Sequence, residues 1–166
     1  MSSPRVFNVL FICTSNSSRS ILAESILNGF RDPRFRAFSA GSHPKGDVNL
    51  HAIKILQENR LPTEGLRSKD WNEFSGPNAP ALDFVFTVCD QAAGEVCPVW
   101  PGQPLTAHWG VEQPAVKPGE NKTLEQKYFE AVALLRRRIE LLLALPLDKL
   151  DRLALQKSLS DIGQTR

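Results

Sequence analysis

The sequence predicts an α/β fold in which a four-stranded parallel sheet carries helices on both faces. Four short apolar segments alternate with longer segments whose apolar residues recur at helical spacing, and Pro and Gly residues punctuate the connections. Strands that alternate with helices in this way build parallel sheets, because each crossover helix must pack back onto the sheet.

Each expected strand is short and rich in apolar residues. The first is almost continuously apolar, which is typical of a strand buried on both faces. The second alternates weakly and ends in the turn Ser39-Ala40-Gly41. The four expected strands are 6–12, 34–40, 82–88 and 105–109.

The expected helices show apolar residues at spacings of three and four. They are 19–30, 48–59, 123–145 and 147–162, with short helical segments at 69–74 and 90–96. Pro146 ends the longest helix, since proline cannot continue a helical hydrogen-bond ladder. The side chains expected to face the core are Leu50, Ile53, Ile55 and Leu56 in the second helix and Phe129, Val132, Leu135, Ile139, Leu142 and Leu143 in the longest.

Length and composition indicate an ordinary globular protein. The 166 residues predict one domain, 1–166, with 147–166 as a C-terminal helical extension. A net charge of +2 gives no reason to expect nucleic acid as a partner, and no apolar run is long enough to cross a membrane. The first residues do not form a secretory signal, so we expect a cytoplasmic protein. Three Cys residues cannot form a fully paired disulfide framework within one chain.

The most informative segment is the loop between the first expected strand and the first helix. It begins at Cys13, and every residue before Arg19 is small or polar. Backbone N–H groups and a helix N-terminus can surround a tetrahedral oxyanion there, and an arginine can bind two of its oxygens. The same positive potential favours a thiolate on Cys13, which predicts a nucleophile near neutral pH. The expected oxyanion-binding residues are Thr14, Ser15, Asn16, Ser17, Ser18, Arg19 and Ser20.

A structural interpretation of the same pair is that Cys13 packs as a small hydrophobe and Arg19 lies on a solvated helix face. That interpretation leaves the strand before the loop, the helix after it and the polar residues between unexplained. Motif matches gain force from such a context, so we favour the thiol nucleophile.

Two further thiols, Cys89 and Cys97, lie eight positions apart. A regular helix would separate them by about 12 Å, whereas a disulfide needs Cα atoms within about 7 Å. They can pair only if the segment unwinds, and two structural cysteines remain an equal alternative on spacing alone. Cys89 follows the third expected strand as Cys13 follows the first, so both thiols could face one crevice at the carboxyl edge of the sheet. The three His residues have no paired spacing with these Cys residues, which disfavours zinc.

At this point the residues resemble the arsenate reductases built on the low-molecular-weight protein tyrosine phosphatase fold. The matching features, in order along 6 to about 145, are the loop 13–20, the Ser39-Ala40-Gly41 turn, Cys89, Cys97 and the segment His108-Trp109-Gly110 with Pro114-Ala115. The loop is shared with the phosphatases, whereas the Cys89–Cys97 pair and the His-Trp-Gly segment are typical of the reductases. The resemblance implies a three-layer fold with a flavodoxin-like outline.

The resemblance also implies a mechanism. The Cys13 thiolate attacks arsenate held by Arg19 and the loop amides, Cys89 then attacks Cys13 and releases arsenite, and Cys97 passes the disulfide outward. Thioredoxin, or glutaredoxin with glutathione, would reduce Cys89–Cys97 as the external thiol reductant. No tightly bound cofactor is implied, phosphate and sulfate are expected as competing anions, and we expect a monomer.

Other loop residues receive roles from the same resemblance. Asn16 is expected to organise the loop by hydrogen bonds, and the hydroxyl of Ser20 to bond the Cys13 sulfur. Some members of the family bind a potassium ion beside this loop, and Asn16, Glu24 and Ser39 match part of that site. No other metal is expected.

The sequence departs from the family pattern at Gln113, where relatives usually have an Asp that acts as general acid. Glu112, one residue earlier, is the candidate replacement, with a solvated loop charge as an equal alternative. General acid catalysis is worth about 10²–10⁴-fold, so the change matters most for phosphate esters. A second departure is Ser18, where some reductases have another Cys.

Three functions therefore compete. The first is an arsenate reductase that uses three thiols. The second is a low-molecular-weight protein tyrosine phosphatase acting through a Cys13 phosphocysteine, against which Gln113 counts. The third is an inactive anion-binding domain, against which the intact Cys13, Arg19, Cys89 and Cys97 count.

Overall fold

The computed structural model describes residues 5–89, 100 and 102–166. Its centre is a four-stranded parallel sheet in the order β2-β1-β3-β4. The strands are β1 (Phe7–Cys13), β2 (Phe35–Gly41), β3 (Phe84–Thr87) and β4 (Leu105–His108). The α/β fold with a four-stranded parallel sheet is confirmed, and each strand begins and ends within two residues of its expected position.

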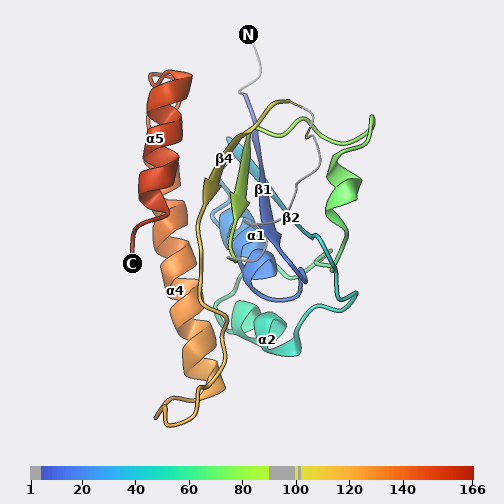
Figure 1. The fold of residues 1–166 in the computed structure, drawn as a ribbon, viewed down its shortest axis with the longest axis vertical. Helices are drawn as coiled ribbons and strands as arrows, with labels where there is room; N and C mark the ends of the chain where they lie inside the picture. Colours follow the sequence, from blue (N-terminus) through green and yellow to red (C-terminus); the bar gives the residue numbers. More distant parts are fainter. Residues whose placement is uncertain (1–4, 90–99, 101) are drawn as a thin grey trace.

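The helices surround this sheet (Figure 1). They are α1 (Arg19–Gly29), α2 (Leu50–Glu58), the 3-10 helix η1 (Trp71–Phe74), α4 (Leu124–Leu143) and α5 (Arg152–Ile162). Thr123 starts α4 with a capping box, in which its side chain and that of Gln126 each bond the other residue's backbone N–H. The helical segment expected at 90–96 lies outside the described residues.

Strand β2 shows that helices cover both faces of the sheet. Ser39 donates a hydrogen bond to Glu24 of α1, whereas the neighbouring Phe38 packs its ring against Phe74 of η1, with centroids 5.5 Å apart. Successive strand residues point to opposite faces, so α1 and η1 lie on opposite sides. Helices α4 and α5 run along the β4 side of the sheet (Figure 1).

The core lies around β1, whose residues 9–12 are completely buried. Two residues that we expected in it are instead on the surface: Leu50 is 83% exposed and Phe129 is 60% exposed. Leu50 is the first residue of α2 and does not lie on the side of that helix that carries the buried Ala52, Ile55 and Leu56. On α4 the inward position belongs to Tyr128, so its neighbour Phe129 is turned away from the core.

Helix α5 starts at Arg152, five residues later than expected, because Asp151 caps it by accepting from the backbone N–H of Ala154. It packs against β4 through close contacts. The indole N–H of Trp109 donates to the carbonyl of Leu159, and Gly163 lies so near His108 that a Cβ there would be 2.2 Å from its carbonyl oxygen. Among the described residues no helix is long and apolar enough to cross a membrane.

Candidate active site

The site is built at the carboxyl end of β1. In the sheet, β1 lies between β2 and β3. The chain passes from β1 to β2 on one side and then to β3 on the other side, so the strand order reverses at β1. Ligands bind at such points in open α/β sheets. Cys13 is the last residue of β1 and its side chain is buried, and the following loop leads directly into α1 at Arg19.

The loop carbonyls face outward. Those of Thr14, Ser15, Ser17 and Ser18 accept hydrogen bonds from the backbone N–H groups of His43, Lys45, Asn49 and Leu22, at 2.8 to 2.9 Å. In a trans peptide the C=O and the next N–H point in opposite directions. The N–H groups that follow these four carbonyls are therefore turned toward the inside of the loop, which is the arrangement an oxyanion requires.

Asn16 holds the loop in this shape. It has a left-handed backbone (φ 47°), and its buried side chain donates to Ser20 Oγ at 2.8 Å and to Ser39 Oγ at 3.0 Å. Its Oδ1 accepts from the backbone N–H of Lys69 at 2.9 Å. These are loop-organising bonds of the kind that the resemblance implied. Ser20 Oγ accepts from Asn16, and the expected hydrogen bond from the Ser20 hydroxyl to the Cys13 sulfur stays a prediction.

Gly41 allows the loop to lie directly on β2. A Cβ at this position would be 2.5 Å from the carbonyl oxygen of Thr14 and 3.0 Å from Asn16. The backbone must move to accept such a contact. Ser39, Ala40 and Gly41, which we had expected to form a turn, are the last residues of β2 and support the loop.

Cys89 lies against Cys13, and both side chains are buried. Cys89 Sγ is 3.3 Å from the backbone N of Thr14, which donates to it, and 3.5 Å from Thr14 Oγ1. A hydrogen bond between the two thiols joins Cys89 to Cys13. The expectation that the two strand ends would bring these cysteines to one crevice is confirmed.

The pKa of Cys13 differs from what the loop alone predicts. The hydrogen bond to Cys89 is the largest influence and raises the pKa, and burial raises it further. Arg19 and the N–H of Ser15 act in the opposite direction, as expected, but they are outweighed. The Cys13 thiol is therefore protonated at neutral pH, because its S–H is stabilised by the neighbouring sulfur.

Arg19 reaches from the start of α1 to the loop after β4. Its Nη1 donates to the carbonyl of Val111 at 2.9 Å. A cavity of about 700 Å³ opens here, lined by Arg19, by the residues His108 and Gly110 to Gln113, and by Gly163, Gln164 and Arg166 after α5. The C-terminal helical extension thus contributes to the wall of this cavity.

Arg138 of α4 holds the loop after β4 in place. It is completely buried on α4 and donates to the carbonyls of Trp109, Gly110 and Thr165. Burial lowers its pKa to about 10. Because a buried guanidinium needs every one of these acceptors, the loop after β4 and the residues after α5 are held to a common anchor.

Glu112 does not have the surroundings of a general acid. It is exposed and forms an ion pair with Lys117, which lowers the pKa of the carboxyl below its ordinary range. A general acid near neutral pH needs a raised pKa. Gln113 is also exposed, at the mouth of the cavity that Arg19 lines.

The remaining sequence expectations concern Cys97 and metal binding. Cys97 lies outside the described residues, so the unwinding of its segment stays a prediction. Among the residues that the structure describes, no group of three or more His, Cys, Asp or Glu side chains could hold a metal ion. Asn16, Glu24 and Ser39, the residues matched to a potassium site, do lie together.

Two residues of the site carried no signal in the sequence. Tyr128 Oη is 3.0 Å from Ser18 Oγ, and its ring stacks on His51 with centroids 5.8 Å apart. Lys69 is buried beside Asn16 and Glu24.

Comparison with known proteins agrees with this geometry. Residues 8–155 match the family model of low molecular weight phosphotyrosine protein phosphatase. Arsenate reductase 1 of Staphylococcus epidermidis is 35% identical over 109 residues, which are 66% of this chain and 79% of that protein. Arsenate reductase of Bacillus subtilis is 32% identical over 120 residues, 72% of this chain and 81% of that one.

Solved structures show the same fold. Arsenate reductase from Archaeoglobus fulgidus superposes with a TM-score of 0.62 and 25% identity, covering 82% of this chain and 99% of that one. A thioredoxin-dependent arsenate reductase from Corynebacterium glutamicum gives a TM-score of 0.60 at 24% identity, covering 90% of this chain and 66% of that one. With its sheet order, its oxyanion loop and a family match over most of its length, the chain belongs to the low-molecular-weight phosphotyrosine protein phosphatase family.

Proposed function

We propose that this protein reduces arsenate to arsenite, with Cys13 as the nucleophile and a thiol relay through Cys89 and Cys97. The observation that carries the proposal is the contact between the Cys13 and Cys89 thiols. Hydrolysis of a phosphate ester through a phosphocysteine requires one cysteine and an arginine, and no step of that reaction uses a second thiol. The names of the relatives support the same choice.

The chemistry balances with these groups. Cys13 Sγ forms a bond to arsenic, and one arsenate oxygen leaves as water. Cys89 Sγ then attacks Cys13 Sγ, the sulfur–arsenic bond breaks, and its electron pair stays on arsenic, which becomes As(III) and leaves as arsenite. Two thiols are thereby oxidised to one disulfide as one arsenate is reduced.

The relay then regenerates the nucleophile. Cys97 attacks Cys89, releasing the Cys13 thiolate and forming a Cys89–Cys97 disulfide, which an external dithiol reduces. Thioredoxin and glutaredoxin with glutathione are the two candidate donors, and both act in reducing compartments such as the cytoplasm. The structurally similar arsenate reductase of Corynebacterium glutamicum is thioredoxin-dependent, which favours thioredoxin as the donor here.

The loop and Arg19 bind the substrate in this proposal. The inward N–H groups and the guanidinium would hold three arsenate oxygens, so that the fourth can leave in line with the attacking sulfur. The raised pKa of Cys13 means that the proton must leave the thiol when arsenate binds. An anionic substrate oxygen close to the sulfur is the nearest base for it.

The test is arsenate-dependent NADPH consumption, with thioredoxin and its reductase in one assay and glutaredoxin, glutathione and their reductase in another. We expect turnover in one of them and none after Cys13→Ser. Cys97→Ser should produce about one arsenite per enzyme and then stop, with a Cys13–Cys89 disulfide found by peptide mapping.

Three outcomes would contradict the proposal. Steady thioredoxin-driven turnover by Cys89→Ser would exclude the relay, and retained turnover by Cys13→Ser would exclude the nucleophile. If the wild-type protein binds arsenate but shows no turnover in either assay, the phosphatase function or the inactive anion-binding function would be favoured. Hydrolysis of p-nitrophenyl phosphate, measured on the same preparation, separates those two.

A further inference from the structure

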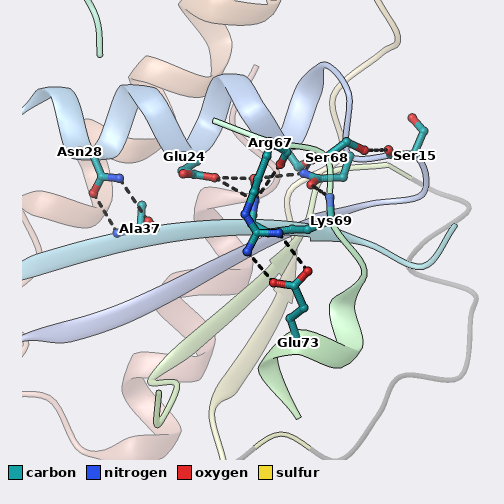
Figure 2. A network of polar contacts seen from close by, with 11 residues as sticks. Ser15, Glu24, Asn28, Ala37, Arg67, Ser68, Lys69 and Glu73 are labelled. Carbon is teal, nitrogen blue, oxygen red and sulfur yellow. Dashed lines mark hydrogen bonds and ion pairs between the residues drawn. The ribbon is translucent and has the colours of Figure 1, made fainter. Parts of the chain in front are cut away.

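A buried polar cluster lies against the loop that follows β1. It consists of Asn16 in the loop, Glu24 on α1, Ser39 on β2 and Lys69 just before η1. The side chains of Lys69 and Glu24 are only 7% and 14% exposed, and Lys69 Nζ lies 3.7 Å from Glu24 Oε1. Figure 2 shows Glu24 and Lys69 gathered beside α1 and the central strands.

The oxygens that matched a potassium site are already engaged in this cluster. Asn16 Oδ1 accepts from the Lys69 backbone N–H at 2.9 Å, and Ser39 Oγ accepts from Asn16 at 3.0 Å. Ser39 in turn donates to Glu24 Oε1 at 2.5 Å. An alkali cation is bound by several oxygens that replace its water shell, and these three residues do not offer such a set.

The ammonium of Lys69 also lies beside Glu24, where the positive charge of a potassium ion would have to lie. Besides its ion pair with Glu24, it donates a hydrogen bond to the carbonyl of Arg67 at 2.9 Å. A potassium ion beside Glu24 would have to lie close to this ammonium, and two like charges in a poorly solvated site repel strongly. The residues present therefore do not fit a potassium ion.

We propose that Lys69 is a built-in cation for the oxyanion loop, which makes the loop independent of potassium. Lys69 acts as a positioning residue through a chain of contacts, from its ammonium to Glu24, then to Ser39 and on to Asn16. Its backbone N–H holds Asn16 directly as well. The neighbouring Ser68 adds a third tie, since its hydroxyl donates to the carbonyl of Ser15 at 3.0 Å (Figure 2).

The pair is held by charge attraction at a cost of burial. Burial is the largest influence on both groups and leaves the pKa of Lys69 lowered and that of Glu24 raised, while the attraction between the two groups opposes both changes. Arg67 also faces Glu24 and favours its carboxylate, while being bound itself to Glu73 at 2.5 and 3.0 Å (Figure 2). Glu24, Lys69, Arg67 and Glu73 are thus two cations facing two anions.

The first test compares potassium with sodium on the wild-type protein. Sulfate and phosphate affinities are measured by calorimetry, and the unfolding temperature by fluorescence, in 100 mM KCl, NaCl or tetramethylammonium chloride. We expect the same affinities and the same unfolding temperature in all three salts. These measurements need only the oxyanion loop and not arsenate reduction, so they can succeed or fail independently of the proposed function.

The second test removes the ammonium. Lys69→Ala should weaken sulfate binding by about tenfold, a typical loss when a group that orients binding residues is removed. Ammonium or potassium chloride should restore much of the loss, because the shortened side chain leaves room for a small cation beside Glu24, whereas tetramethylammonium is too large to enter. The matched control is Lys157→Ala, which removes an exposed lysine on α5 and should leave sulfate affinity unchanged in every salt.

The proposal would be overturned if potassium tightened sulfate binding to the wild-type protein relative to tetramethylammonium. It would also fail if Lys69→Ala bound sulfate as the Lys157→Ala control does, or if its loss were the same in every salt, which would indicate packing alone. If Lys69→Ala does not fold, the double variant Glu24→Gln/Lys69→Met removes both charges of the pair. That variant should fold and gain nothing from potassium, and a gain would contradict the role assigned to Glu24.

Discussion

Removal of the Cys89 sulfur should make Cys13 more reactive, although Cys89 is itself a residue of the proposed relay. In the folded protein the Cys13 S–H is hydrogen-bonded to Cys89, and this bond is the main reason that the pKa of Cys13 is raised. Cys89→Ala takes the acceptor away, so the protonated form of Cys13 loses its partner. Arg19 and the Ser15 N–H, which favour the thiolate, are untouched.

The size of the effect follows from the strength of one neutral hydrogen bond. Such a bond contributes about 0.5–1.5 kcal/mol net, which corresponds to a thiolate population about 2- to 13-fold higher at a pH below the pKa. Burial still raises the pKa of Cys13 in the variant. The alkylation rate of the wild-type thiol should therefore keep rising with pH beyond the range in which an ordinary cysteine, with a pKa of about 8.5, levels off.

The assay is alkylation by iodoacetamide at several pH values, followed by peptide mass spectrometry that reads Cys13 separately from Cys97. Cys89→Ser is the matched control for access, because its hydroxyl still accepts a hydrogen bond while opening a similar space. We expect Cys13 to react about 2- to 13-fold faster in the Ala variant than in the Ser variant. Equal rates in the two variants, or a slower rate in Cys89→Ala, would refute the hydrogen bond as the cause.

Three further changes test the surroundings of the site. Gln113→Asp restores a carboxyl where relatives have the general acid, so hydrolysis of p-nitrophenyl phosphate should rise at least about tenfold; no rise would mean that the pocket itself excludes esters. Arg138→Met leaves the buried carbonyl of Trp109 and the partly buried carbonyls of Gly110 and Thr165 without their charged donor, and should lower the free energy of unfolding in urea by about 3 kcal/mol; a loss below about 1 kcal/mol would contradict the anchor. Gly163→Ala forces a Cβ against the His108 carbonyl and should cost about 1–3 kcal/mol in the same experiment, whereas Gly76→Ala, whose Cβ meets nothing within 4 Å, should be nearly neutral.

Much of the fold could be predicted because its signals are local. The apolar run that became β1 and the helical phase that became α4 are each contained in one segment. The expectation failed at Phe129, whose side chain is as apolar as the core residues near it. Its exposure depends on Tyr128 taking the inward position, where the hydroxyl reaches Ser18, and no periodicity within the helix distinguishes two adjacent aromatic residues.

In the active site, too, some features could be predicted from the sequence and others could not. Cys13 and Arg19 could be found because the loop that joins them is continuous, and Cys89 because parallel strands end at one edge of the sheet. The direction of the pKa shift of Cys13 could not be predicted from the sequence, because the loop was considered without Cys89. A loop of N–H groups lowers a thiol pKa, but the interaction with Cys89, together with burial, outweighs this effect and raises the pKa.

The groups that hold the loop after β1 are distant from it in sequence. No local sequence motif therefore contains both partners of these contacts. Asn16 and Lys69 are 53 positions apart, Arg19 and Val111 are 92 apart, and Ser18 and Tyr128 are 110 apart. A single lysine in a polar stretch is ordinarily a solvated surface residue. Lys69 becomes a buried cation only because β2 and α1 bring Ser39 and Glu24 to it, so this part of the chemistry is specified by the fold and not by any motif. A relative that keeps the loop but lacks this lysine should accordingly need another cation at the same place.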